Sequence, residues 1–221
     1  MFSYITSFLE NPREMLIFLL LSIPGRFMAL SLHEFAHAWM ANRCGDPTAR
    51  MLGRLTVNPA RHLDPVGTVM MLLLGFGWAK PVPVNPRNFK NYRRDDIIVS
   101  LAGIVTNLIV ALITTIVFYF SLRGTLGSNE AFYSIVLNII TINLSLAVFN
   151  LLPIYPLDGS HVFESLFMRK IPKFFMFMRN YGQYILIALL VFGVISSVLG
   201  YVVNALFRLF SWIALALVGL F

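Results

Sequence analysis

The sequence predicts an all-α polytopic membrane protein with about four to six transmembrane helices and a re-entrant or β-loop insertion between the first and the second. Two observations support this fold class. Of the 221 residues, 58 % are hydrophobic and 12 % are charged, whereas an ordinary soluble domain carries about 25 % charged residues. The apolar segments also follow one another with only short polar breaks. We therefore expect residues 1–221 to form a single membrane domain.

The formal net charge of +7 comes from basic residues in the loops between the apolar segments. A nucleic-acid-binding protein would instead concentrate such charge on one helix face or in a tail, so we expect no nucleic-acid partner. Nine of the seventeen Lys and Arg residues lie between Asn42 and Asp96, which places this region in the cytoplasm by the positive-inside rule. The only cysteine, Cys44, excludes an intrachain disulfide and a Cys-rich metal site.

The first predicted span runs from Met15 to Ala41, and Pro24 and Gly25 are candidates for a kink within it. Val66 to Ala79 is an apolar run too short for a span, which favours a re-entrant or interfacial segment. The next residues, 80–86, contain three prolines and must be extended.

Ile97 to Leu122 and Ala131 to Leu152 predict the second and third spans, joined by a turn that belongs outside. The third span returns to a second basic cluster, which is again cytoplasmic. Tyr184 to Phe221 is long enough for two further spans, with a break expected near Gly200.

The first span contains His33-Glu34-Phe35-Ala36-His37. Histidines four residues apart share one face of a helix, so both imidazoles can bind one metal ion, and the intervening Glu34 can act as a base on a water molecule. The alternative is that these side chains form hydrogen bonds between packed helices. Three ionisable residues in a lipid-spanning helix are costly, which favours a functional site.

A third ligand is needed for zinc, and the candidate is Asp158, in the segment that runs from Asn150 to Gly159. The first span runs from outside to inside with its histidines near the inner end, and the third span also reaches the inside near Asp158. Both motifs are therefore expected at a similar depth. Pro153 and Pro156 prevent a regular helix there, although a simple helix-ending turn would contain the same residues.

The two motifs together resemble the site-2 protease family, whose pattern is HExxH followed much later by NxxPxxxLDG. The resemblance extends to Ala102-Gly103-Ile-Val-Thr-Asn107 and to Gly75-Phe-Gly77, and it covers roughly residues 25–170. It implies a minimal zinc metalloendopeptidase without a PDZ or nucleotide-sensing domain. The catalytic core would lie at about residues 15–165 and the C-terminal helices at about residues 182–221.

The resemblance implies one Zn²⁺ per chain, with Glu34 as general base and later proton donor. It also implies hydrolysis of a peptide bond within or beside a substrate's transmembrane helix, in regulated intramembrane proteolysis or in removal of signal-peptide remnants. Asn150 and Asn107 would hydrogen-bond the substrate backbone, although interhelical hydrogen bonds are an equal alternative. Gly75, Gly77 and the extended residues after them would bind the substrate as an edge strand, or form a purely structural loop.

Two other readings remain open. A transporter or channel could use the same His, Glu and Asp residues as a cation path, but it would predict an inverted repeat, which the sequence lacks. An inactive family member would have no need of Glu34. The expected location is a prokaryotic cell (inner) membrane with the active site toward the cytoplasm, and the expected partners are transmembrane-helix proteins and the lipid bilayer. The remaining histidines, His62 and His161, are expected at the water interface.

Overall fold

The structure is a computed structural model that describes residues 10–74, 77–124 and 129–219. Its long, apolar helices are α2 (Pro12–Cys44), α5 (Tyr92–Leu122), α6 (Glu130–Asn150), α8 (Pro172–Val191) and α9 (Val194–Val218). They are connected by α3 (Thr48–Met51), α4 (Pro65–Leu74), α7 (Asp158–Phe167) and two 3-10 turns, η1 (Pro59–Arg61) and η2 (Pro86–Asn88). The predicted fold class, an all-α polytopic membrane protein, is confirmed.

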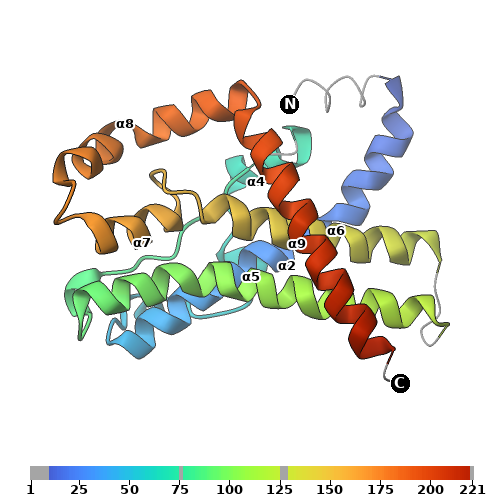
Figure 1. The fold of residues 1–221 in the computed structure, drawn as a ribbon, viewed down its shortest axis with the longest axis horizontal. Helices are drawn as coiled ribbons and strands as arrows, with labels where there is room; N and C mark the ends of the chain where they lie inside the picture. Colours follow the sequence, from blue (N-terminus) through green and yellow to red (C-terminus); the bar gives the residue numbers. More distant parts are fainter. Residues whose placement is uncertain (1–9, 75–76, 125–128, 220–221) are drawn as a thin grey trace.

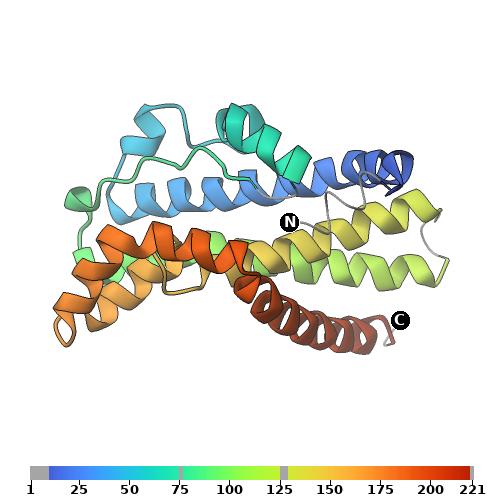
Figure 2. The same cartoon turned by 90° about the horizontal axis from the view of Figure 1, so that it is seen from above.

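Helices α2, α5 and α6 form the central bundle, and α9 crosses α5 and α6 on one side (Figures 1 and 2). Small residues let the bundle close tightly: a Cβ atom on Gly25 of α2 would lie only 3.2 Å from the Cα atom of Ile139 in α6. A buried hydrophobic cluster joins α5, α6 and α9 and comprises Ala111, Val136, Ile140, Leu144 and Phe210.

Helix α2 contains Pro24 in its interior and bends, so that its N-terminal part diverges from α6 (Figure 1). A proline removes one helical hydrogen bond and its ring clashes with the preceding turn, which is the usual cause of such a bend. The helix ends at Gly45, whose φ of 110° is a left-handed conformation that favours glycine.

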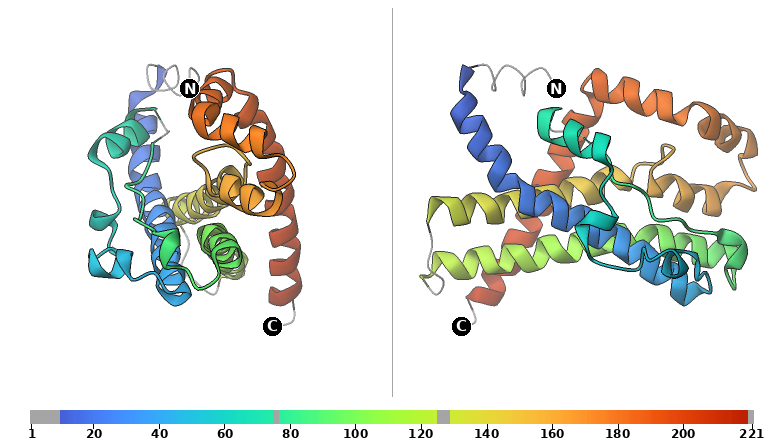
Figure 3. Two further views of the ribbon diagram at one scale, coloured as in Figure 1. Left: turned by 90° about the vertical axis from the view of Figure 1, so that its left-hand side faces the viewer. Right: turned by 180° about the vertical axis from the view of Figure 1, so that it is seen from behind.

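The segment between α2 and α5 contains helix α4, and the non-helical residues 77–80 pack against it, beside α2 (Figure 3); we call α4 and these residues the α4 hairpin. A β-bridge between Leu63 and Ala79 closes its base, and Lys80 N donates to His62 O over 2.8 Å. This bridge is the only β-pairing among the described residues, so no regular strand lies in the described part of this insertion. Residues 80–86 were expected to be extended; residues 80–85 have no helical structure, but the 3-10 turn η2 begins at Pro86, so the expectation was wrong for that residue.

Helices α8 and α9 run head to tail from the end that holds α7 toward the end that holds the α5–α6 turn (Figures 1 and 3). The break between them lies at Gly193, with a φ of 73°, and Gly200 lies inside α9, so the break expected near Gly200 was wrong. The sequence pattern missed Gly193 because the residues around it are as apolar as those in the helices.

Candidate metal centre

His33 and His37 lie one turn apart on α2 and are both buried, with 4 % and 8 % of their surface exposed. Their Nε2 atoms are 3.0 Å apart. Two imidazole nitrogens this close repel if both carry a lone pair or both carry a proton, so a cation between them would stabilise the arrangement. The helical spacing of the motif therefore produces the expected convergence.

Asp158 approaches the same point from the first position of α7, 125 residues away from His33 in the chain. Its Oδ2 atom lies 3.1 Å from His33 Nε2 and 3.3 Å from His37 Nε2. Helix α6 ends at Asn150, and the proline-containing residues after it turn the chain before α7 begins. The irregular segment expected from Pro153 and Pro156 is thus present, and it delivers the carboxylate to the histidines.

The spacing of these three atoms fits a zinc site. In a tetrahedral site with Zn–N and Zn–O bonds of about 2.0–2.2 Å, ligand atoms are about 3.3 Å apart. The observed separations of 3.0, 3.1 and 3.3 Å are close to this value. Two neutral imidazoles and one carboxylate leave the fourth position for water, as in catalytic zinc sites.

The far nitrogen of each imidazole is held by a hydrogen-bond acceptor. His33 Nδ1 lies 2.7 Å from Asn107 Oδ1, and His37 Nδ1 lies 2.8 Å from the backbone oxygen of Val99, both in α5. Because these oxygens accept, each Nδ1 carries the proton and each Nε2 presents its lone pair to the ion. Asn107, which is fully buried, thus makes interhelical contacts, the alternative role that the sequence left open.

Two residues that contribute to the site were not predicted as site residues. Asn143 in α6 is fully buried and its Oδ1 accepts from Asn107 Nδ2 at 2.9 Å, which fixes the orientation of the Asn107 amide. Gly103 in α5 faces both imidazoles, because a Cβ atom there would lie 2.6 Å from His33 Cε1 and from His37 Nε2. A buried Asn in an apolar helix was the signal available for Asn143.

Glu34 lies on the side of the site that faces the extended segment. Its Oε2 atom accepts a hydrogen bond of 2.8 Å from the backbone N–H of Val82. Glu34, His37 and Asp158 line a cavity of about 290 Å³, together with Val82 and His161. The candidate base and two candidate ligands therefore face one space, with the extended segment as its wall.

Three further residues were predicted to bind substrate: Asn150, Gly77 and Gly75. Asn150 is half-buried at the end of α6, where its Nδ2 donates to Leu146 O at 3.0 Å. Gly77 packs against α4, since a Cβ atom there would lie 2.1 Å from Gly67 O. Gly75 lies outside the described residues.

Of the two other histidines, His161 is exposed, as expected, and borders the cavity beside Asp158. His62 was expected at the water interface but is fully buried. Its Nε2 bonds the backbone oxygen of Thr56 at 2.7 Å, which ties the loop after α3 to the base of the α4 hairpin. The local pattern gave no signal of this burial, because Ala79 and Lys80, which pair with Leu63 and His62, come from farther along the loop.

The far end of the extended segment is fixed by Asp46, which is fully buried after the end of α2. Its carboxylate accepts from Thr48, from the backbone N–H of Asn85 at 2.7 Å and from Asn88 Nδ2 at 2.8 Å. Burial raises the pKa of Asp46, but the hydrogen bonds from Thr48, Asn85 and Asn88 outweigh it and hold the pKa below its usual range. The segment is therefore anchored at Glu34 and at Asp46.

Comparison with known proteins identifies relatives of the chain. The model of peptidase family M50 matches residues 125–193, which include Asp158. "Putative zinc metalloprotease YwhC" of Bacillus subtilis is 38 % identical over 217 residues, which cover 92 % of this chain and 95 % of the relative. Rip2 of Mycolicibacterium smegmatis, with the same description, is 32 % identical over 66 % of this chain and 56 % of its own length. The zinc metalloprotease MJ0392 of Methanocaldococcus jannaschii is 23 % identical over 84 % of this chain and 46 % of its own length. No solved structure matches the chain.

Proposed function

This chain belongs to peptidase family M50 and is an integral membrane zinc metalloprotease, and we propose that it cleaves peptide bonds within or beside the transmembrane segments of other membrane proteins. The observation that carries the proposal is the position of the candidate site. His33 and His37 lie in a helix that is long and apolar enough to cross the bilayer, and Asp158 meets them there. A substrate must therefore reach the site at the depth of its own membrane segment.

We assign zinc binding to His33, His37 and Asp158 and proton transfer to Glu34. Bound Zn²⁺ would polarise the scissile carbonyl and lower the pKa of the attacking water. Glu34 takes a proton from this water as it adds to the carbonyl carbon. It then gives the proton to the departing amine nitrogen, so that the C–N bond breaks and Glu34 returns to its ionised form.

The extended segment is suited to bind the substrate backbone on one side only. In an extended chain, the N–H and C=O groups of alternate residues point to the same side. Pro81 and Pro83 carry no N–H, so the N–H donors of this stretch belong to Val82 and Val84, and the Val82 N–H already donates to Glu34 Oε2. Arg54 donates to the carbonyl oxygens of Lys80 and Pro81, which engages these two acceptors. A substrate unwound at the site would pair with the N–H of Val84, which lies on the same side of the segment as the Val82 N–H.

The active site faces the cytoplasmic side in this proposal. The C-terminal end of α2, the start of α5 and helix α7 lie at one end of the molecule (Figure 1), and the basic loops of the chain are at this end. Lys and Arg accumulate in cytoplasmic loops because they are costly to translocate. The substrate would belong to the same membrane, and its cleaved end would be released toward the cytoplasm.

The chain is proposed to act as one domain, with the catalytic core and the C-terminal helices packed together. Phe210 of α9 lies in the same buried cluster as Ala111 of α5 and Ile140 of α6. A C-terminal helix that shares the core of the bundle is not an independent unit. We therefore expect removal of α9 to destabilise the core.

The proposal is tested with purified wild-type protein and the variants Asp158→Ala and Glu34→Gln, reconstituted in vesicles. Zinc per chain is measured by mass spectrometry, and cleavage is measured on a panel of single-span test proteins with spans that contain Gly or Pro. We expect one zinc in the wild type, loss of zinc in Asp158→Ala and full zinc in Glu34→Gln. Cleavage by Glu34→Gln should fall by about 10²–10⁴-fold.

Each result has a counterpart that contradicts the proposal. A folded wild type without zinc would leave the proposed ligand set without its metal. Undiminished cleavage by Glu34→Gln would assign the proton transfer to another residue.

A further inference from the structure

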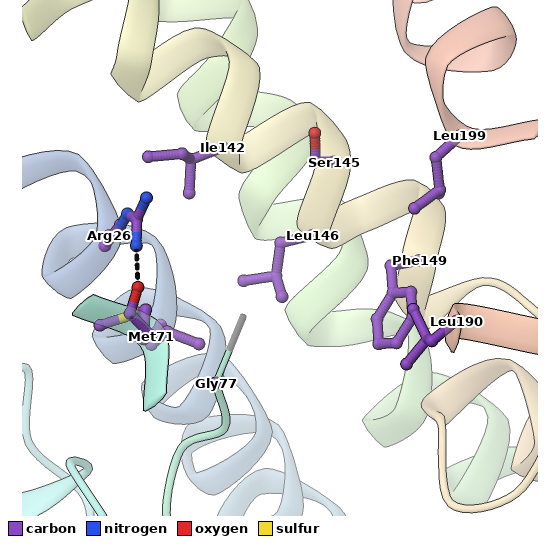
Figure 4. Close-up of a pocket in the computed structure, with 10 residues that line it drawn as sticks. Arg26, Met71, Gly77, Ile142, Ser145, Leu146, Phe149, Leu190 and Leu199 are labelled. Carbon is purple, nitrogen blue, oxygen red and sulfur yellow. Dashed lines mark hydrogen bonds between the residues drawn. The ribbon is translucent and has the colours of Figure 1, made fainter. Parts of the chain in front are cut away.

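A second cavity, of about 340 Å³, lies over α6 at some distance from the zinc-binding atoms. Its walls are α2 and the α4 hairpin on one side and the α8–α9 junction on the other, with α6 as the floor (Figure 4). Leucine, isoleucine, phenylalanine and methionine side chains dominate its lining. The one charged residue among the described lining residues is Arg26.

Arg26 lies in a helix that crosses the membrane and is buried, with 8 % of its surface exposed. Its Nη1 donates to the backbone oxygen of Met71, near the C-terminal end of α4 (Figure 4). This contact is a structural role, because the last carbonyls of a helix lack partners within the helix. It engages one of five guanidinium N–H groups with a neutral acceptor, so the charge itself is not neutralised.

No carboxylate side chain in the described residues pairs with this guanidinium. All ten acidic residues lie within the described ranges, and no ion pair there joins any of them to Arg26. Charged side chains inside a bilayer usually pair with an opposite charge or face an aqueous cavity, because an isolated charge is costly in lipid. The partner of Arg26 is therefore to be sought in a molecule that enters the cavity.

The cavity and the candidate active site lie along the same face of α2. Arg26 precedes His33 by seven residues, or two helical turns, and the two therefore share a face of α2 at a separation of about 10 Å along the axis. An extended chain advances about 3.3 Å per residue. A substrate held open at the zinc site would thus place a residue about three positions from the scissile bond beside Arg26.

We propose that Arg26 is a specificity-determining residue that binds an acidic side chain in the transmembrane segment of the substrate, about three residues from the scissile bond on the side away from the cytoplasm. The inference rests on the proposed function and names its substrate class. A carboxylate matches the planar guanidinium and offsets its charge, and the apolar walls match the rest of a membrane segment. An acidic side chain is costly inside the bilayer, so pairing with Arg26 would favour its entry into the cavity.

The test uses binding, so that it does not depend on cleavage. Glu34→Gln protein is placed in phosphatidylcholine vesicles with Leu/Ala peptides of about 20 residues that carry a photo-crosslinker. A single Asp is moved along the peptide, and each Asp peptide has a matched Asn peptide. We expect Asp to raise the crosslinking yield at least about tenfold over Asn at one or two adjacent positions.

Variants of the protein assign this preference to Arg26. Both variants are made in the Glu34→Gln protein. Arg26→Gln keeps a donor for the backbone oxygen of Met71 but has no charge, so it should lose the preference for Asp over Asn peptides. Arg26→Lys keeps the charge and should retain part of this preference. Arg208→Gln is the matched control, because Arg208 is an exposed arginine of the spanning helix α9 and does not line the cavity. Zinc content near one per chain shows that each variant is folded.

The outcomes separate the two proposals. Equal crosslinking of Asp and Asn peptides at every position, or a preference that survives in Arg26→Gln, overturns the assignment of Arg26. If protein with Glu34 intact then cleaves Asp and Asn peptides equally, the proposed protease function stands and only the role of Arg26 is lost. A carboxylate preference without any cleavage keeps the Arg26 site and contradicts the proposed function.

Discussion

The backbone N–H of Val82 lies 2.8 Å from Glu34 Oε2, so the candidate base is hydrogen-bonded to the segment that is proposed to hold the substrate. Val82→Pro removes this N–H while the neighbouring prolines already favour an extended chain. We expect cleavage of the test proteins to fall about 10–100-fold, as for the loss of a hydrogen bond to a charged group, with zinc content unchanged. Val82→Ala keeps the N–H and should be close to wild type. Equal losses in both variants would assign the effect to the side chain.

Gly103→Ala should abolish zinc binding. The added methyl group would lie 2.6 Å from atoms of both His33 and His37, which no real Cβ contact allows, and the imidazoles would have to move. Gly200→Ala is the control, because Gly200 also lies in a spanning helix but has open space around it. Metal analysis of the two purified variants makes the comparison. Full zinc in Gly103→Ala would show that the histidines do not occupy the positions described.

Asn107→Leu should weaken zinc binding about 10–100-fold without abolishing it, because His33 loses the acceptor that fixes its tautomer and ring orientation. Competition with chelators of graded affinity measures the change. Thr115→Val in the same helix is the control, since Thr115 is also fully buried but bonds only the backbone of Ala111. If both variants weaken zinc binding equally, the effect is a general loss of packing.

Asp46 should make stability depend on pH in the acidic range. Its pKa is lower in the folded protein than the value of about 3.9 expected when unfolded. Its contribution is therefore fully present above the unfolded pKa and is lost as pH falls through the folded pKa. Thermal unfolding of wild type and Asp46→Asn should differ at pH 7, and the difference should shrink below pH 4 or so. A difference that is constant with pH would contradict the role assigned to the carboxylate.

The head-to-tail order of α8 and α9 predicts the location of the C-terminal end. A reporter fused after Gly219 should report the same side as one inserted at the α5–α6 turn after Arg123, and the opposite side from one fused after Arg94. If α8 and α9 formed an antiparallel pair instead, the fusions after Gly219 and Arg94 would report the same side. An external location for the Arg94 fusion would overturn the cytoplasmic placement of the active site.

Sequence patterns predicted the parts of the site that depend on local geometry. The turn of an α-helix fixes the relation between His33 and His37, and the prolines before Asp158 fix the break that carries it to them. The spans were also predictable, because apolar length decides whether a segment can cross a bilayer.

The parts that depend on contacts between distant segments were not predictable in this way. Gly103 and Asn143 matter because α5 and α6 bring them against the imidazoles and Asn107, and no spacing within one helix encodes such contacts. The burial of His62 has the same cause. The break at Gly193 was missed for a different reason, since the residues beside it in the chain are as apolar as a helix interior.

The long separation of the ligands along the chain has a consequence for biosynthesis. His33 enters the membrane early, but Asp158 follows it by 125 residues, after two further spanning helices have been made. Until then the ribosome holds a chain with two histidines and no third ligand, which cannot complete a catalytic zinc site. With the proposed ligand set, a membrane zinc metalloprotease therefore has no complete metal site until its third spanning helix has been made.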